Sequence, residues 1–310
     1  MSYTITPLSI NNIKDLTYLY KKVFNNKYTI DLVIRKYNTS YLGVSYFGHI
    51  AYNNGEPVAF HGAIPVKMEY NSNYEIAAQY GDAMTLPKHT GKGLFTKLGK
   101  LTDEQLKEVN ITFVWGFPNQ NSEYGYLNKL DWQYVDRMQG FKIKTAKLTL
   151  EKAARKLHLT NQLFDLHVIK VFKKYKTSAK IKGSVYNQGI PVSTYRNIDY
   201  YNYKSFTNNF TIAINDVLFW IKIKNGLLVG DIETPSKQHF YKALTELKKI
   251  AITNGISEIV FQSSPNTLIT ELLNGKANEH FESWIVGYKN FSSHFPLEKL
   301  KLTFGDLDTF

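Results

Sequence analysis

Apolar positions near the start of the chain recur at helical spacing. From Ile13 to Phe24 they fall every three or four residues, which predicts a helix that Ser9 caps. Thr29 and Asp31 are residue types that begin helices, so a second helix is expected from there to about Tyr37. The first forty or so residues are therefore predicted to form two amphipathic helices.

Three segments rich in β-branched and aromatic residues follow. Strands are predicted at Tyr46–Tyr52, Pro57–Tyr70 and Tyr74–Leu86. The turns between them, Asn53-Asn54-Gly55 and Asn71-Ser72-Asn73, contain residues that tolerate positive φ. This pattern predicts an antiparallel meander.

After Pro87 the pattern changes from strand to alternating elements. A loop at Lys88–Gly93 leads into a helix from Leu94 to Val109. A short strand at Ile111–Phe117, a helix at Ser122–Leu130 and a strand at Gln133–Ile143 are then expected.

The second half repeats this order of elements but few of its residues. After a mostly helical stretch at Leu148–Lys176, Ser236 is expected to cap the main helix, which Asn254-Gly255 ends. The other predicted elements are strands at Asn209–Asn215, Val217–Lys224, Leu227–Glu233, Ser257–Ser263 and Ser283–Tyr288, and a helix at Asn266–Leu273. We interpret this order as a tandem duplication whose second copy has lost its glycine loop. The predicted fold class is α/β (α+β mixed), with a mostly antiparallel sheet in each of two domains, 1–147 and 186–310, joined by a helical connection at 148–185.

Composition narrows the chemistry. With 43% hydrophobic residues, the 310-residue chain can bury a large core. It contains no cysteine, which excludes disulfides, thiolate metal sites and a cysteine nucleophile. No metal site is predicted. No apolar run reaches the length of a membrane span, and a cytoplasmic protein is expected.

The formal net charge of +12 is spread along the chain. Its densest cluster comprises Lys170, Lys173, Lys174, Lys176, Lys180 and Lys182. This cluster fits the solvated face of a connecting helix, and also a membrane-surface or nucleic-acid contact. Because a positive field attracts any polyphosphate, charge alone does not separate these interpretations.

The loop after the third strand of the meander is suited to an anion. Amides at the start of a helix lack intrahelical acceptors, and the helix dipole is positive there. Gly91 and Gly93 let the backbone approach a phosphate closely, and Lys88, His89 and Lys92 add donors. The glycine spacing does not fit a Walker loop, and Thr96 occupies the third glycine position of a dinucleotide fingerprint. Without further context, such a loop is equally consistent with an ordinary helix entry.

Two blocks of residues resemble the GCN5-related N-acetyltransferase (GNAT) family. The first is Asp82-Ala83-Met84-Thr85-Leu86-Pro87 followed by Lys88–Phe95. The second runs from Gly116 through Asn119 and Ser122 to Tyr126 and Leu130-Asp131-Trp132. The resemblance covers residues 1 to about 145, and the order of elements suggests a degenerate GNAT-like domain in the second half.

The sequence departs from the family pattern at several positions. Lys88 stands where Gln or Arg is usual, Thr90 replaces an Arg, and Asp131 occupies a Gly position. Tyr126 matches the family's thiolate-protonating tyrosine in the register that begins at Asn119, whereas the other register places Leu127 there.

The resemblance implies direct acyl transfer from acyl-CoA, expected to be acetyl-CoA, to an amine. Met84 and Leu86 amides would bind the pantetheine arm, and amides from Thr90 to Phe95 would hold the pyrophosphate. Tyr126 would protonate the leaving thiolate. The implied cosubstrate-binding residues are Met84, Thr85, Leu86, Lys88, His89, Thr90, Gly91, Lys92, Gly93, Leu94, Phe95 and Asn119.

The general base is left open among Asp82, His61 and Glu75. His61 also fits a packed histidine, and Asp82 a carboxylate that satisfies neighbouring donors. The C-terminal segment Phe304–Phe310 carries two carboxylates that could clamp an amine, but docking of the tail on the fold is the favoured interpretation.

Three functions follow. The leading hypothesis is an N-acetyltransferase for a small amine such as an amino sugar or amino acid, with homodimer formation an open expectation. The second is a tRNA-dependent aminoacyltransferase of the peptidoglycan-bridge type, although a nucleic-acid partner is not favoured. The third is a non-catalytic CoA-binding or scaffold protein.

Overall fold

The computed structural model describes residues 2–145, 150–156, 161–185 and 189–310. They form two compact units. Unit 1 comprises Met1–Asp136 and Trp284–Leu300, and unit 2 comprises Arg137–Ser283 and Lys301–Phe310. The predicted domain limits at 147, 148 and 186 lie outside the described residues. Two strands, β6 (Gln133–Lys144) and β12 (Glu279–Asn290), contribute residues to both units.

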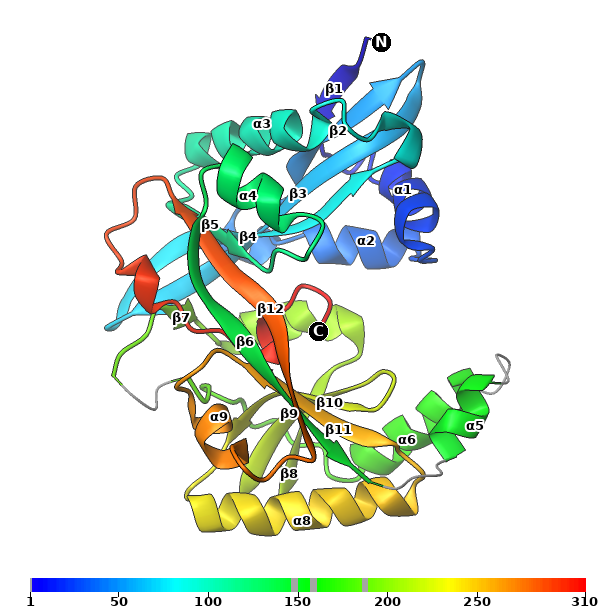
Figure 1. The fold of residues 1–310 in the computed structure, drawn as a ribbon, viewed down its shortest axis with the longest axis vertical. Coiled ribbons are helices and arrows are strands. Elements are labelled where there is room, and N and C mark those ends of the chain that lie inside the picture. Colours follow the sequence, from blue (N-terminus) through cyan, green and yellow to red (C-terminus); the bar gives the residue numbers. More distant parts are fainter. Residues whose placement is uncertain (1, 146–149, 157–160, 186–188) are drawn as a thin grey trace. The chain divides into compact units, whose positions relative to one another are not determined.

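Unit 1 is a sheet in the order β1-β2-β3-β4-β5-β12. Every neighbouring pair is antiparallel except β4 and β5. Helices α3 and α4 lie on one face of this sheet and α1 and α2 on the other (Figure 1). The strands are β1 (Thr4–Pro7), β2 (Phe47–Asn53), β3 (Glu56–Tyr70), β4 (Asn73–Thr85) and β5 (Phe113–Gly116), and the helices are α1 (Lys14–Phe24), α2 (Ile30–Tyr37), α3 (Leu94–Glu108) and α4 (Glu123–Lys129).

The start of unit 1 confirms one predicted cap and corrects another. The Thr29 side chain accepts a hydrogen bond from the Leu32 amide, as expected of an N-cap. Helix α1, however, begins at Lys14 with Ile13 as its N-cap, so the prediction for Ser9 was wrong. The Ser9 amide instead donates to the side chain of Asn12, which forms a turn before the helix. Strand β1 was not predicted, because four residues carry too little periodicity.

Strands β4 and β5 pair over only a short distance. Their parallel register runs from Ala78 opposite Val114 to Tyr80 opposite Gly116 and stops there. Just beyond, the register of β4 against β3 shifts, so that Asp82 and Ala83 together oppose His61. Asp82 has a left-handed φ of 57°. This β-bulge bends β4 where it parts from β5.

Unit 2 has a sheet in the order β6-β11-β10-β9-β8, with helix α8 packed against it. Part of the expected helical stretch at 148–176 forms two helices, and its residues 148–149 and 157–160 lie outside the described residues. The remaining elements are β7 (Ser193–Thr194), β8 (Phe210–Ile214), β9 (Val217–Ile223), β10 (Leu227–Glu233), β11 (Glu258–Ser263), α5 (Leu150–Lys156), α6 (Asn161–Lys173), α7 (Ile198–Lys204), α8 (Lys237–Thr253) and α9 (Leu268–Leu273).

Unit 2, like unit 1, contains a parallel strand pair next to a register shift. Its parallel pair, β10 and β11, is in register from Leu227 to Val229, after which β10 shifts register against β9. The helix that follows begins differently, because Ser236 accepts a hydrogen bond from the His239 amide. This confirms the predicted cap and gives α8 a side-chain cap, which α3 lacks.

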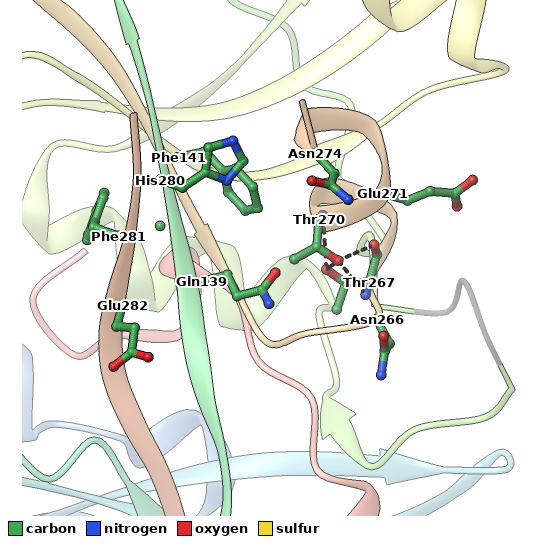
Figure 2. A pocket seen from close by; sticks show the side chains of 11 residues that line it. Gln139, Phe141, Asn266, Thr267, Thr270, Glu271, Asn274, His280, Phe281 and Glu282 are labelled. Carbon is green, nitrogen blue, oxygen red and sulfur yellow. Dashed lines mark hydrogen bonds between the residues drawn. The ribbon is translucent and has the colours of Figure 1, made fainter. Parts of the chain in front are cut away.

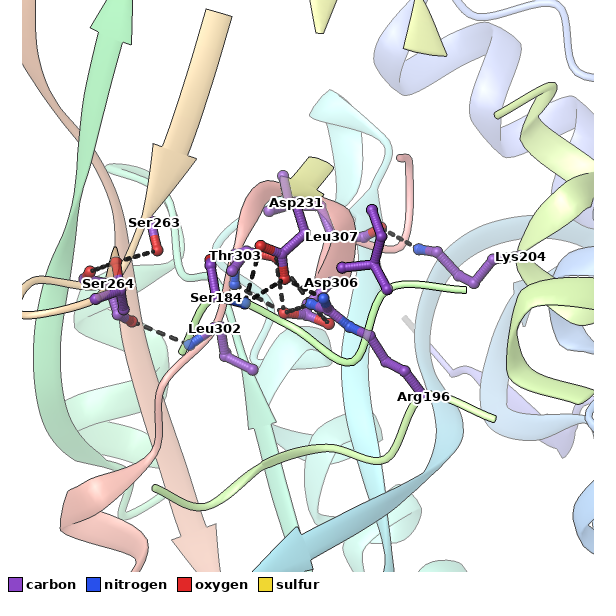
Figure 3. Close-up of polar contacts among 12 residues, drawn as sticks. Ser184, Arg196, Lys204, Asp231, Ser263, Ser264, Leu302, Thr303, Asp306 and Leu307 are labelled. Atoms are coloured by element: carbon purple, nitrogen blue, oxygen red, sulfur yellow. Dashed lines mark hydrogen bonds and ion pairs between the residues drawn. The ribbon is translucent and has the colours of Figure 1, made fainter. Parts of the chain in front are cut away.

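The C-terminal segment docks on unit 2, as the favoured interpretation had it (Figure 3). Arg196 forms ion pairs with both Asp231 and Asp306, and all three side chains are at most 3% exposed. Phe310 packs on Trp220, with 5.1 Å between ring centroids. A side chain at Gly230, in the register shift of β10, would meet the Phe310 ring. The tail therefore occupies the place where β10 leaves its parallel neighbour.

No helix in the part of the chain that the structure describes combines the length and hydropathy needed to cross a bilayer.

Replacing Arg196 should destabilise unit 2 strongly. Arg196→Met leaves two buried carboxylates without a counter-charge, and we expect a loss of about 3–5 kcal/mol in the free energy of unfolding. Urea unfolding followed by circular dichroism measures it, with the two units fitted as separate transitions. Lys249→Met, which removes an exposed pair with Glu246, is the control and should change little. Equal urea midpoints for Arg196→Met and the wild type would contradict this account of the tail.

Candidate active site

The register of β4 decides which amides face the gap beside β5. The Leu86 amide donates to the Val58 carbonyl of β3 at 2.8 Å. Because amide direction alternates along a strand, Met84, which pairs with Phe60, also faces β3, whereas Thr85 faces the opposite edge. The Leu86 amide is therefore not available to a ligand, and the prediction for it is wrong. The Met84 amide points the same way as that of Leu86, so the amide that faces the open edge of β4 is that of Thr85, between them.

The glycine loop connects this edge to helix α3. Gly91 and Gly93 have φ of 74° and 75°, and a β-carbon at either would meet nothing within 4 Å. The first intrahelical bond runs from the Lys97 amide to the Gly93 carbonyl at 3.0 Å. The amides before Lys97 therefore have no intrahelical acceptor, and Gly93 offers no capping side chain.

Four predicted loop donors differ in their availability to a ligand. Lys88 and Lys92 are exposed beside the glycines. The His89 side chain is buried, with Nδ1 3.0 Å from the Tyr3 hydroxyl, so it packs into the fold. The Thr90 amide donates to the Pro87 carbonyl at 3.3 Å and is not available to a ligand. The cationic character of the loop thus comes from its two lysines.

His61 and Tyr126 are in contact, as a site made of the two would require. His61 Nε2 lies 3.2 Å from the Tyr126 hydroxyl oxygen. Both side chains are buried, and burial, followed by the nearby His49, lowers the pKa of His61 to about 3. Since an imidazole with that pKa is neutral and a very weak base at pH 7, His61 does not suit the role of general base.

Close packing brings α4 against α3 and places Tyr126 in this contact. A β-carbon at Gly125 would overlap the Phe95 ring, so glycine is needed there. The rings of Phe95 and Tyr126 meet edge to face with centroids 5.0 Å apart. The Trp132 amide donates to the Tyr126 carbonyl at 3.1 Å, which closes the turn after α4. Asp131 in this turn has a left-handed φ of 57°, which favours Gly and which Asp tolerates.

A network of buried polar residues, which the sequence did not predict, lies beside His61 and Tyr126. The Tyr80 hydroxyl donates to Asp103, and Lys289 pairs with Asp103 at 2.8 Å. Burial, then the Asp103 charge, raises the pKa of Tyr80 well above its ordinary value. Lys289 lies on β12, so no local pattern could have linked it to Asp103.

Asp82 lies on the other face of the sheet, away from His61 and Tyr126. Its Oδ2 accepts hydrogen bonds from Tyr20 and Tyr37 and pairs with Lys36 at 2.5 Å. These three donors come from α1 and α2, and none was predicted. The carboxylate therefore anchors the bulge to both helices and does not form a group with His61 and Tyr126.

Two other predicted residues are also engaged elsewhere. Glu75 accepts from the Thr112 hydroxyl at 2.6 Å, and it is seven residues along β4 from Asp82, about 20 Å away in an extended strand. Asn119 accepts from the amides of Asn121 and Ser122, so its side chain forms the turn before α4.

Unit 2 contains a separate open cavity of about 530 Å³ (Figure 2). None of the predicted site residues lines it. Glu271, one of its carboxylates, pairs with Lys237, while the Thr267 and Thr270 side chains hydrogen-bond with each other. The cavity is lined by Gln139, Gly140, Phe141, Asn266, Thr267, Thr270, Glu271, Asn274, His280, Phe281 and Glu282.

A segment of unit 1 matches a known family model. Residues 4–135 match the family model described as an acetyltransferase (GNAT) domain. No curated protein sequence matches the chain. Residues 4–135 are therefore similar to a GNAT acetyltransferase domain.

Solved structures extend the likeness of fold over nearly the whole chain. A GCN5-related N-acetyltransferase from Kribbella flavida superposes with a TM-score of 0.56 at 12% identity, covering 93% of this chain and 72% of that one. A probable N-acyltransferase from Enterococcus faecalis gives a TM-score of 0.59 at 12% identity, with coverage of 94% and 73%. A GCN5-related N-acetyltransferase from Anabaena variabilis gives 0.56 at 13% identity, with coverage of 92% and 72%. At such identities the likeness concerns the fold alone.

Proposed function

We propose, on the premise that residues 4–135 carry an acetyltransferase domain, that unit 1 transfers an acyl group from acyl-CoA directly to an amine. The observation that carries this proposal is the order of two groups of backbone amides along the chain. The first is the Thr85 amide on the open edge of β4, and the second is the set of amides around Gly91 and Gly93, while the Leu86 and Thr90 amides between them donate within the chain. A pantetheine arm and a pyrophosphate need donors in that order.

Each group of amides suits one part of the cosubstrate. The Thr85 amide would pair with the pantetheine arm, since it faces the edge that β5 leaves open. Amides from Gly91 to Phe95 at the start of α3 would hold the pyrophosphate. Lys88 and Lys92 add positive charge beside this second group.

The reaction needs one nucleophile and one acid. The nitrogen of a neutral amine attacks the thioester carbonyl, the new C–N bond forms, and the C–S bond breaks. The amine nitrogen gives up a proton to solvent, and the Tyr126 hydroxyl donates its proton to the departing thiolate, which leaves as CoA thiol. The Tyr126 phenolate then takes up a proton from solvent. Asp82 holds the bulge in place through its ion pair with Lys36. His61 does not accept the proton of the amine, because its pKa is about 3.

Acetyl-CoA is the donor we propose, and a small amine such as an amino sugar or an amino acid is the acceptor. An uncapped, glycine-flanked helix entry beside two exposed lysines favours an acyl-CoA enzyme over a tRNA-dependent aminoacyltransferase. The pair of His61 and Tyr126 favours catalysis over a binding role alone.

Unit 2 is proposed to be a degenerate second copy that does not bind CoA. Ser236 satisfies an amide at the start of α8 that would otherwise face a phosphate. Phe310 fills the place beside Gly230, where β10 leaves β11. We therefore expect one acyl-CoA per chain.

Replacing both loop glycines tests the donor site. Isothermal titration with acetyl-CoA should give one site per wild-type chain, and Gly91→Val with Gly93→Val should weaken binding at least about a hundredfold, because β-carbons obstruct several charge-assisted amide contacts. Gly43→Val with Gly55→Val is the matched control. Those two glycines have φ of 80° and 81° and equally open surroundings, so the backbone strain is the same. No binding to the wild type, or equal weakening in both double variants, would contradict the assignment.

Replacing Tyr126 tests the acid. Tyr126→Phe should lower kcat by about 10²- to 10⁴-fold and leave the affinity for acetyl-CoA unchanged. Release of CoA thiol with a panel of amino sugars and amino acids measures turnover. Tyr124→Phe, at a residue 65% exposed on the same helix, is the control and should match the wild type. Wild-type turnover in Tyr126→Phe would remove the proposed role.

A further inference from the structure

We propose that His61 is a positioning residue that donates a hydrogen bond from Nε2 to the phenol oxygen of Tyr126. In this arrangement the phenol hydrogen is not used in the bond to His61 and can be directed to the leaving group. The catalytic consequence rests on the proposed function, whereas the hydrogen-bond arrangement itself does not.

The fold allows the imidazole ring little freedom. His61 lies on β3 with its backbone paired to His49, and its carbonyl accepts from Thr102. Its ring meets the rings of Tyr80, Phe95 and Tyr126 edge to face, with centroids 4.6, 5.4 and 5.8 Å away. A ring so enclosed presents Nε2 to Tyr126 and cannot turn without disturbing three aromatic neighbours.

The two ring nitrogens have different surroundings, and this difference identifies the tautomer. Nε2 lies 3.2 Å from the Tyr126 hydroxyl, whereas Nδ1 is buried with no hydrogen-bond partner in the described chain. A neutral imidazole carries one N–H and one bare nitrogen. A buried N–H without an acceptor is rarer and costlier than an unused lone pair, so the proton belongs on Nε2. A second proton on Nδ1 would have no hydrogen-bond acceptor, in keeping with the pKa of about 3 for His61.

This tautomer determines what Tyr126 can do. If Nε2 were bare, Tyr126 would donate its hydrogen to His61 and could not give it to a thiolate. With the proton on Nε2, the phenol oxygen accepts the hydrogen bond instead, and a bond donated to this oxygen favours its deprotonated form. Once the thiolate has been protonated, the same N–H stabilises the phenolate through a charge-assisted bond. His61 thus makes Tyr126 a stronger acid without exchanging a proton itself.

The tautomer can be measured without any activity. The full chain labelled with ¹⁵N-histidine should show, in a long-range proton–nitrogen correlation spectrum, a His61 ring with protonated Nε2 and bare Nδ1. His61→Gln assigns the signal by its disappearance. The ring should stay neutral from pH 8 to pH 5, where a free histidine with a pKa of 6.5 is mostly protonated. A protonated Nδ1, or titration near pH 6.5, would overturn the proposal.

Two matched variants test the catalytic consequence. His61→Gln places an amide N–H near the position of Nε2, whereas His61→Met has a side chain of similar length without a donor. We expect Gln to keep most of kcat and Met to lose about tenfold, the size of one hydrogen bond, with unchanged affinity for acetyl-CoA. In a Tyr126→Phe background, Met should cost nothing further, because the bond it removes is already absent.

Each outcome of these experiments is decisive. Equal losses for Gln and Met, or an added loss in the Tyr126→Phe background, would show a merely structural role and overturn the proposal. If His61→Met fails to fold, two measurements still test the proposal: the kcat of His61→Gln against that of the wild type, and the tautomer of His61 in the wild type. A wild-type chain with the predicted tautomer but no acyl transfer would count against the proposed function and leave the hydrogen-bond assignment standing.

Discussion

The structure depends on one constraint, the parting of β4 from β5 after Tyr80 and Gly116. The bulge at Asp82 bends β4 at that point, and the buried ion pair with Lys36 fixes it to α2. Removing one partner of such a buried pair costs about 3–5 kcal/mol, because the other charge is left buried without a counter-charge. Because the two strands part, the Thr85 amide lacks a neighbouring strand and is left facing the gap. Everything proposed about the cosubstrate follows from that amide and from the loop it leads to.

The same constraint explains the difference between the two units. In unit 2 the parallel strands β10 and β11 also stop pairing early, and an exposed strand edge inside a core must be covered. The C-terminal tail covers it with Phe310 and with Asp306, whose charge Arg196 neutralises. Each unit thus has a short parallel strand pair, and in unit 2 the C-terminal tail covers the place where that pair ends.

Periodicity and turn residues were enough to predict most elements. The structure confirms the meander, the glycine loop, α3, and the caps at Thr29 and Ser236. Each of these depends on residues that are close together in the sequence. The direction of the amides at Met84, Thr85 and Leu86 could not be predicted, because it depends on the register of β4 against β3 beyond a bulge. A bulge adds one residue and shifts which amides face the gap, and no local pattern records it.

Long-range partners were likewise beyond the reach of sequence patterns. Asp82 was named as a candidate general base, but its partners lie on α1 and α2, 45 or more positions away in the sequence. The contact of His61 with Tyr126 spans 65 positions, and that of Arg196 with Asp306 spans 110. Each residue type was visible, but the pairing arises only when the sheet forms.

Amide hydrogen exchange with and without acetyl-CoA tests the central claim most directly, since it reports on individual backbone groups. The account predicts that acetyl-CoA protects the amides of Thr85 and of Gly91 to Phe95, and leaves those at the start of α8, from Ser236 to His239, unchanged. Protection that falls at the start of α8, or that spares Thr85 and the glycine loop, would contradict it.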